Sequence, residues 1–147
     1  MQPDIHVNYL AIVAAVVSNI VIGFLWYGPV FGGAWRREMG VAADARPPAG
    51  AMRRSMILMI FGAFLMAWVL SYDVAVWRPS SWRAGAADQP ASAYGFFSAL
   101  FVWLGYLVPL LLGAIAWENK SWRLFAINAG YWFIALLAMG MILAYWR

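Results

Sequence analysis

The sequence predicts an all-α membrane protein: a bundle of four transmembrane helices in antiparallel up-down order. Two observations carry this prediction. The chain has 147 residues, of which 65% are hydrophobic and 11% charged, whereas about a quarter of the residues in a soluble domain are charged. The apolar residues are also concentrated in four long runs, at about 7–27, 55–76, 94–117 and 124–146. We expect residues 1–147 to form a single transmembrane domain.

Each run is long enough to cross a bilayer as a helix, which needs about 20 apolar residues. Apolar side chains continue around every face and do not alternate as they would in a barrel strand. The first run should be retained rather than cleaved as a signal peptide. No Lys or Arg precedes Arg36, and the run is too long for the apolar part of a signal peptide.

Half of the ten tryptophans are followed directly by arginine. Tryptophan prefers the membrane–water interface, and a guanidinium can meet lipid phosphates there. All of these pairs flank the apolar runs, so we predict that they anchor the helix ends at the interface. The pairs are Trp35-Arg36, Trp77-Arg78, Trp82-Arg83, Trp122-Arg123 and Trp146-Arg147.

The distribution of basic residues predicts the orientation. Seven Lys and Arg residues lie in the first and third loops, against three on the other side. Cytoplasmic loops carry the excess of basic residues. We therefore expect both termini on the outer, periplasmic side of a bacterial inner membrane.

The first loop should begin with a helix end and a short interfacial segment. Proline disfavours helical geometry in the residue before it, so Gly28-Pro29 should end the first helix. Residues 31–40 can place apolar side chains on one side of a segment lying at the interface. The third loop, Glu118 to Ser121, is a tight turn that makes the last two helices an antiparallel hairpin.

The span interiors contain no charged residue, and their main polar residues are two asparagines. Asn19 and Asn128 fall at similar depths in the first and fourth spans. We predict that they form interhelical hydrogen bonds between these helices, or that each bonds a backbone carbonyl. Such contacts contribute about 0.6–2 kcal/mol in membranes. The alternative is that both line a polar pocket for a ligand head group.

A kink is predicted in the third span, which contains Gly105 and Pro109. Proline lacks the amide hydrogen and collides with the carbonyl four residues before it. In a small bundle such a kink more often improves packing than serves gating.

The residue types for catalysis or metal binding are sparse. The chain has no cysteine and one histidine, which excludes thiolate and multi-histidine metal sites. Asp73, Asp88 and Glu118 are scattered rather than clustered. We expect no enzyme activity, no cofactor and no metal, with ligation of a haem or chlorin by His6 as a remote alternative. The basic residues lie in short loops, which argues against nucleic-acid binding.

Two motifs resemble those of a family of small membrane proteins known as domain of unknown function 1761. The first is Trp26-Tyr27-Gly28-Pro29-Val30-Phe31-Gly32-Gly33-Ala34-Trp35, where Gly28 replaces a frequent serine. The second is Trp117-Glu118-Asn119-Lys120 followed by Ile127-Asn128-Ala129-Gly130-Tyr131. The resemblance implies four helices in this order and leaves the activity open. Its signature residues are Trp26, Tyr27, Pro29, Phe31, Gly32, Trp35, Asn128 and Gly130.

Two functions fit these patterns. The first is an accessory or stabilising subunit of a larger membrane assembly, or a homo-oligomer, in contact with lipids and other membrane subunits. The second is a small carrier or channel for a neutral or lipidic substrate, formed by oligomerisation.

Overall fold

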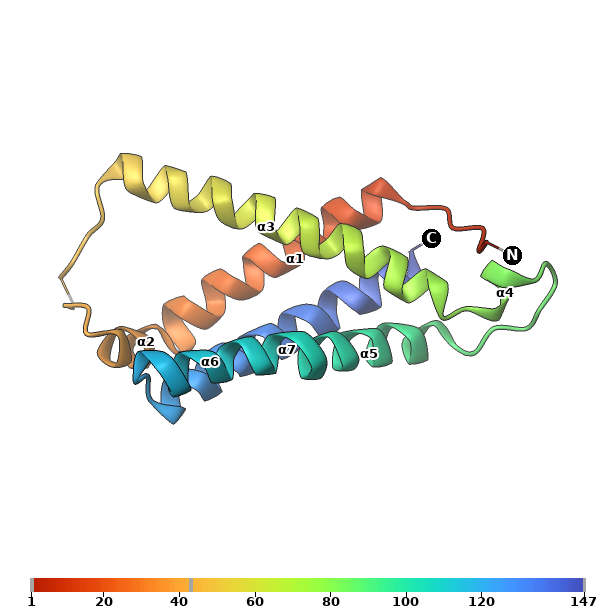
Figure 1. The fold of residues 1–147 in the computed structure, drawn as a ribbon. Helices are drawn as coiled ribbons and strands as arrows, with labels where there is room; N and C mark the ends of the chain where they lie inside the picture. The colour runs from red at the N-terminus through yellow and green to blue at the C-terminus, as the bar shows by residue number, and fades with distance from the viewer. Residues whose placement is uncertain (1, 43, 147) are drawn as a thin grey trace.

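The computed structural model describes residues 2–42 and 44–146. Within these residues the fold is all-α, without a strand, which confirms the predicted class. Four helices are long and apolar enough to cross a membrane: Tyr9–Val30, Ala49–Val76, Ala91–Glu118 and Trp122–Tyr145. Figure 1 shows them extended along one axis, with the chain reversing direction from each helix to the next and both ends of the chain at the same end of the molecule.

Two of the four long helices contain a π-helical segment. Two short helices lie in the connections between the long ones. The elements in chain order are α1 (Tyr9–Leu25), η1 (Trp26–Val30), α2 (Gly32–Met39), α3 (Ala49–Val76), α4 (Pro79–Trp82), α5 (Ala91–Val102), η2 (Trp103–Leu107), α6 (Val108–Glu118) and α7 (Trp122–Tyr145).

Local sequence explains most of the helix boundaries. The Asn8 side chain accepts hydrogen bonds from the amides of Leu10 and Ala11 at the start of α1, and Ser121 caps α7 in the same way. Such caps satisfy amides that have no partner within the helix. Gly40 ends α2 with a φ of 67°, a left-handed conformation that glycine adopts without steric cost.

Helix α3 begins at Ala49, six residues before the apolar run that we predicted to span from 55. Pro48 precedes its first residue, and the fixed φ of proline suits a helix start. The first turns of α3 therefore extend beyond the apolar run and carry Arg53 and Arg54.

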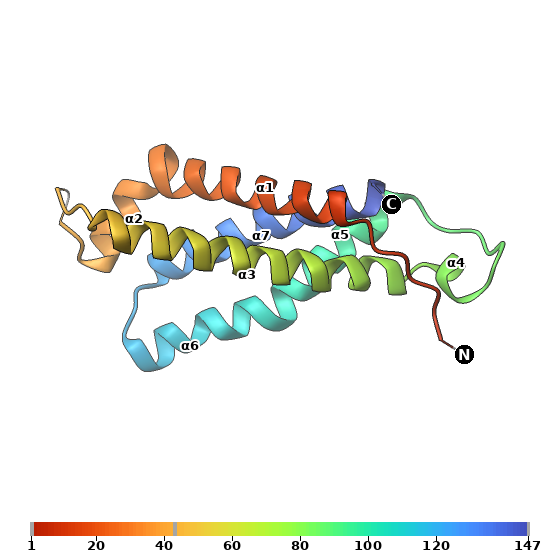
Figure 2. The same cartoon turned by 90° about the horizontal axis from the view of Figure 1, so that it is seen from above.

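Helix α7 forms the centre of the bundle. It contacts α1, α3, α5 and α6, and Figure 2 shows it running alongside α1 and α5. Its Leu136 and Met139 are fully buried and pack in one core with Ile12 and Leu70. Because α7 touches every other long helix, its position determines where the other helices can pack.

Helices α5 and α7 cross at a pair of glycines. A Cβ atom at Gly95 would lie 2.8 Å from the Gly140 carbonyl oxygen, and one at Gly140 would lie 2.6 Å from the Gly95 oxygen. Small residues of this kind allow the backbones of membrane helices to approach closely. Both positions therefore require glycine at the present helix separation.

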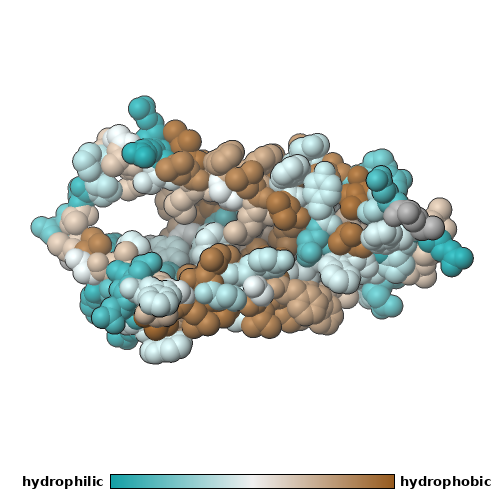
Figure 3. All heavy atoms as spheres, viewed as in Figure 1, coloured by the Kyte–Doolittle hydropathy of each residue, from teal (hydrophilic) through white to brown (hydrophobic). Residues whose placement is uncertain are grey.

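The two ends of the bundle differ in packing. We name them the α4 end (residues 2–10, 74–92 and 140–146) and the α2 end (residues 26–54 and 113–125). At and next to the α2 end, every residue from 49 to 62 is exposed, and no residue of α6 is buried. Figure 3 shows the molecule hollowed there, between α2 and the start of α3.

The Gly95–Gly140 crossing yields a stability prediction. Gly95→Ala or Gly140→Ala should force the α5 and α7 backbones apart and destabilise the protein by about 1–3 kcal/mol, the usual cost of overpacking. Gly113→Ala is the matched control, because a Cβ there meets nothing within 4 Å. Thermal unfolding in detergent should show a lower midpoint for the first two variants only. An equal shift in all three would contradict the close crossing.

Candidate functional site

The first long helix breaks at the family signature. Gly28 has φ −99° and ψ −105°, outside the helical region, and Pro29 has no amide hydrogen to continue the ladder. The Phe31 amide instead donates to the Trp26 carbonyl over 2.7 Å, which closes a π-helical turn. A Cβ at Gly32 would lie 2.3 Å from the Tyr27 carbonyl oxygen. The break thus requires glycine at position 32 as well as the proline.

Two aromatic side chains just before the break contact α7. The Trp26 indole Nε1 donates to the Ile127 carbonyl over 3.0 Å, and the Tyr27 hydroxyl donates to Asn128 Oδ1 over 2.9 Å. Gly130 makes room for this contact, since a Cβ there would lie 3.0 Å from the Trp26 ring. The two family motifs therefore bind each other directly.

A third hydrogen bond joins the first and last long helices, further from the break. The Tyr131 hydroxyl donates to Asn19 Oδ1, and both residues are buried. Each asparagine thus links the first and last long helices through a tyrosine, rather than through the other asparagine or a backbone carbonyl. We call Asn19, Trp26, Tyr27, Asn128, Gly130 and Tyr131 the signature cluster.

The two motifs in the sequence already contain these tyrosine partners. Each matched motif holds one Tyr, at positions 27 and 131. The two rings also pack against each other, with centroids 5.0 Å apart. A buried Tyr hydroxyl needs an acceptor, and the asparagine of the facing helix supplies it.

Helix α2 folds back from the break and joins the cluster to the last hairpin. The Trp35 ring lies edge-on to Tyr27, with centroids 5.8 Å apart. Glu38 accepts a hydrogen bond from the Ser121 hydroxyl and lies 3.9 Å from Arg123. The segment predicted at 31–40 is thus a helix that packs beside the start of α7.

The third long helix is interrupted where a kink was expected. Its π-helical segment η2 contains Gly105 and ends two residues before Pro109. The Trp103 indole donates to the Ala129 carbonyl over 2.8 Å and holds this segment to α7. Tyr106 in the same segment is 69% exposed.

One predicted interfacial anchor has a different role. Arg78 is 6% exposed and therefore does not reach lipid phosphates. Its guanidinium donates to the Ala144 carbonyl at the end of α7, lies 3.6 Å from Asp88 and sits over the Tyr94 ring at 4.8 Å. A planar guanidinium serves several such partners at once. Arg78 thus joins α3, α5, α7 and the second loop.

The other predicted anchors remain at the surface in varying degree. Trp77, Trp82, Trp122 and Trp146 are exposed and Trp35 is partly buried. Arg36, Arg83 and Arg123 are exposed, while Arg147 lies outside the described residues. The nearby loop has its own clamp, because Asp88 accepts hydrogen bonds from the Ser80 amide and hydroxyl and so fixes α4.

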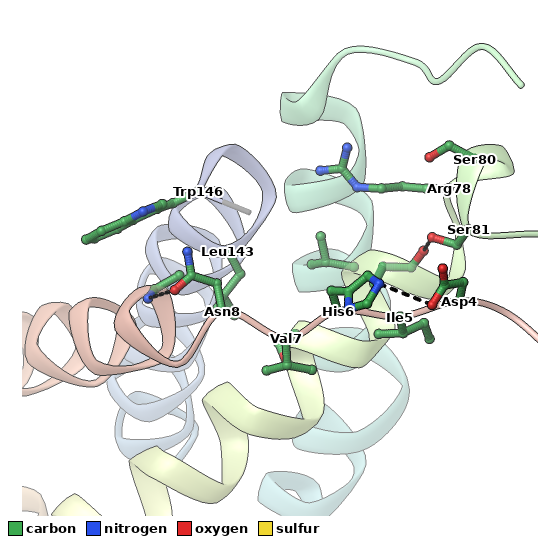
Figure 4. A pocket seen from close by; sticks show the side chains of 14 residues that line it. Asp4, Ile5, His6, Val7, Asn8, Arg78, Ser80, Ser81, Leu143 and Trp146 are labelled. Atoms are coloured by element: carbon green, nitrogen blue, oxygen red, sulfur yellow. Dashed lines mark hydrogen bonds and ion pairs between the residues drawn. The ribbon is translucent and has the colours of Figure 1, made fainter. Parts of the chain in front are cut away.

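An open pocket of about 580 Å³, lined by both polar and apolar residues, lies at the α4 end. Figure 4 shows it between the N-terminal segment with His6 and Asn8, the end of α7 with Trp146, and the Arg78 side chain. His6 pairs with Asp4 at 3.3 Å, and both side chains are almost fully exposed. Within the described ranges, no three His, Asp or Glu side chains gather closely enough to hold a metal ion.

The polar side chains of the signature cluster are mutually satisfied. They are neutral amides and hydroxyls, and the two tyrosine donors have acceptors inside the cluster.

The cluster predicts an asymmetric response to loss of a hydroxyl. Tyr131→Phe removes the donor to Asn19 and should lower the free energy of unfolding by about 0.6–1.7 kcal/mol. Tyr106→Phe makes the same chemical change at an exposed ring and should have no effect. Comparing their unfolding midpoints in one detergent provides the measurement, and a larger effect at Tyr106 would refute the assignment.

Arg78 predicts a second contrast, within one loop. Arg78→Gln removes a charge-assisted hydrogen bond to α7 and leaves Asp88 without the guanidinium, so stability should fall by about 2 kcal/mol. Arg83→Gln, at an exposed position in the same loop, should change it little. Limited proteolysis should cut residues 77–90 faster in the first variant alone. Equal cleavage of both variants would show that Arg78 does not hold the loop.

Comparison with known proteins identifies the family. The model of a protein family of unknown function, DUF1761, matches residues 10–144. No curated protein and no solved structure matches the chain. The match spans both motifs of the signature cluster and all four long helices, and the chain therefore belongs to the DUF1761 family.

Proposed function

We propose that this chain is a non-catalytic protein of the bacterial inner membrane that associates with other membrane helices. It acts as an accessory or stabilising subunit of a larger assembly, or as a homo-oligomer. The observation that carries the proposal is the loose packing of α6, the second half of the third span, in which no residue is buried. A helix that packs on so little of its own chain has surface available for a partner.

The exposed face of α6 has the composition of a helix-packing surface. Leu110, Gly113 and Trp117 follow one another at helical spacing, and Trp117 is 90% exposed. A Cβ at Gly113 would meet nothing within 4 Å. A small residue between two large apolar ones lets a second helix approach closely. Water does not drive this contact within lipid, so van der Waals fit must provide the affinity.

The proposed orientation places the α2 end in the cytoplasm and both chain termini outside. The support is the seven Lys and Arg residues of the first and third loops, because basic loops stay cytoplasmic. A partner on α6 would then contact the cytoplasmic half of the third span.

A small carrier for a neutral or lipidic substrate is the second candidate. It is favoured by η2, the π-helical segment of the third span, since π-helical turns within α-helices occur frequently at functional sites. Flux measurements in proteoliposomes with a panel of neutral solutes and lipids test it. Absence of flux across the panel would remove this candidate.

Association predicts a site-specific cross-link. Because the chain has no cysteine, Leu110→Cys introduces a single thiol on the exposed face of α6. In native membranes treated with a reagent that joins a thiol to a photoreactive group, it should form a cross-linked species on irradiation, while Val13→Cys, at an exposed position of α1, should not. Native mass spectrometry then tells a second copy from a different subunit. A monomer without adducts from both variants would overturn the proposal.

A further inference from the structure

A groove of about 300 Å³ lies between α1 and α3 at the α2 end. Ile20, Phe24 and Tyr27 form one wall, and Met52, Met56 and Met59 form the other. We propose that this groove binds one acyl chain of an anionic phospholipid, whose head group lies beside the arginines at the start of α3. The inference does not rest on the proposed association.

The shape of the groove suits a single chain. The first and last residues that line it on the first long helix, Ile20 and Gly28, are eight residues apart, which is about 12 Å at the rise of a helix. Further along α3, Ala63 and Ala67 are buried in the core, so the two helices close together there. A transmembrane helix about 10 Å across is too wide for the closed end of such a wedge.

The lining is almost entirely apolar. The Tyr27 hydroxyl is directed to Asn128, which leaves its ring as the surface offered to the groove. Three methionines line the opposite wall, and flexible thioether side chains adapt to irregular apolar ligands. The chemistry therefore favours a hydrocarbon chain over a polar substrate.

Charge complementarity selects the head group. Arg53 and Arg54 directly follow Met52, the first lining residue of α3, and both are exposed. The loops at this end carry seven basic residues and three acidic ones. One of the acids, Glu38, is already engaged by Ser121 and Arg123. Basic residues beside a membrane surface attract anionic lipids with about 1 kcal/mol each.

The same feature explains why α3 has an exposed half inside a membrane protein. Residues 49–62 are exposed. The side of this half that faces α1 lines the groove. A bound acyl chain would supply the missing contacts on that side. A second copy of the chain is the competing occupant, and the experiment separates the two.

Native mass spectrometry of delipidated protein in detergent, titrated with phosphatidylglycerol or phosphatidylcholine, tests the proposal. We expect one tightly bound phosphatidylglycerol and about tenfold weaker binding of phosphatidylcholine. Met56→Trp fills the groove and should weaken phosphatidylglycerol binding about tenfold or more. Leu58→Trp adds the same ring at an exposed position outside the lining and should leave binding unchanged. Arg53→Gln with Arg54→Gln should remove the preference between the two lipids.

Several outcomes would overturn the proposal. The first is equal binding of phosphatidylglycerol by the two tryptophan variants. The second is no preference for the anionic lipid in the unmodified chain. The third is a dimer that Met56→Trp alone dissociates, which would assign the groove to a second copy. A phosphatidylglycerol with a photoreactive acyl chain adds a test without mutation. It should label peptides containing Phe24 and Met56, and labelling confined to other peptides would also refute the site.

Discussion

The break at Gly28–Pro29 and its contact with α7 constrain the rest of the structure. Trp26 and Tyr27 lie immediately before the non-helical Gly28. Both rings pack on the last helix, where an indole and a hydroxyl find acceptors at Ile127 and Asn128. In lipid, a polar group that leaves its partner has no water to replace it. The contact therefore fixes the relative depth of the first and last helices.

The other helices pack on α7 at different distances. Helix α5 approaches backbone to backbone at Gly95 and Gly140, and Arg78 closes the α4 end by reaching the last turn of α7. Among the residues that the structure describes, the α2 end shows no equivalent clamp on α3 or α6. The exposed half of α3 and the unburied α6 are the result. The molecule thus has one end at which Arg78 joins the helices and one end with apolar surface left for lipids or partner helices.

Much of this architecture could be predicted from the sequence because bilayer thickness dictates helix length. The four apolar runs and the break at Pro29 follow from residue type alone. The use of Arg78 could not be predicted in this way, since a Trp-Arg pair at a span end is typical of a lipid-facing anchor. Its burial depends on Asp88 and Tyr94, which the chain brings close only after the second loop folds.

The signature cluster shows the same limit. The asparagines indicated that the first and last helices are joined by polar contacts, because few other polar groups lie in the spans. Which side chains the asparagines meet depends on how each helix is rotated about its axis. Helices that are apolar on every face do not reveal this rotation in their sequence. Gly130 illustrates the point: in the sequence it is one more small residue, whereas in the fold it makes room for the Trp26 ring.

A double-mutant cycle between Tyr27 and Asn128 tests most directly whether the two family motifs hold each other. The free energies of unfolding of Tyr27→Phe, Asn128→Leu and the double variant would be compared with the unmodified chain in one detergent. We predict a coupling energy of about 0.5–2 kcal/mol, the range for side chains in direct contact. Effects of the two single variants that add without coupling would contradict the central contact.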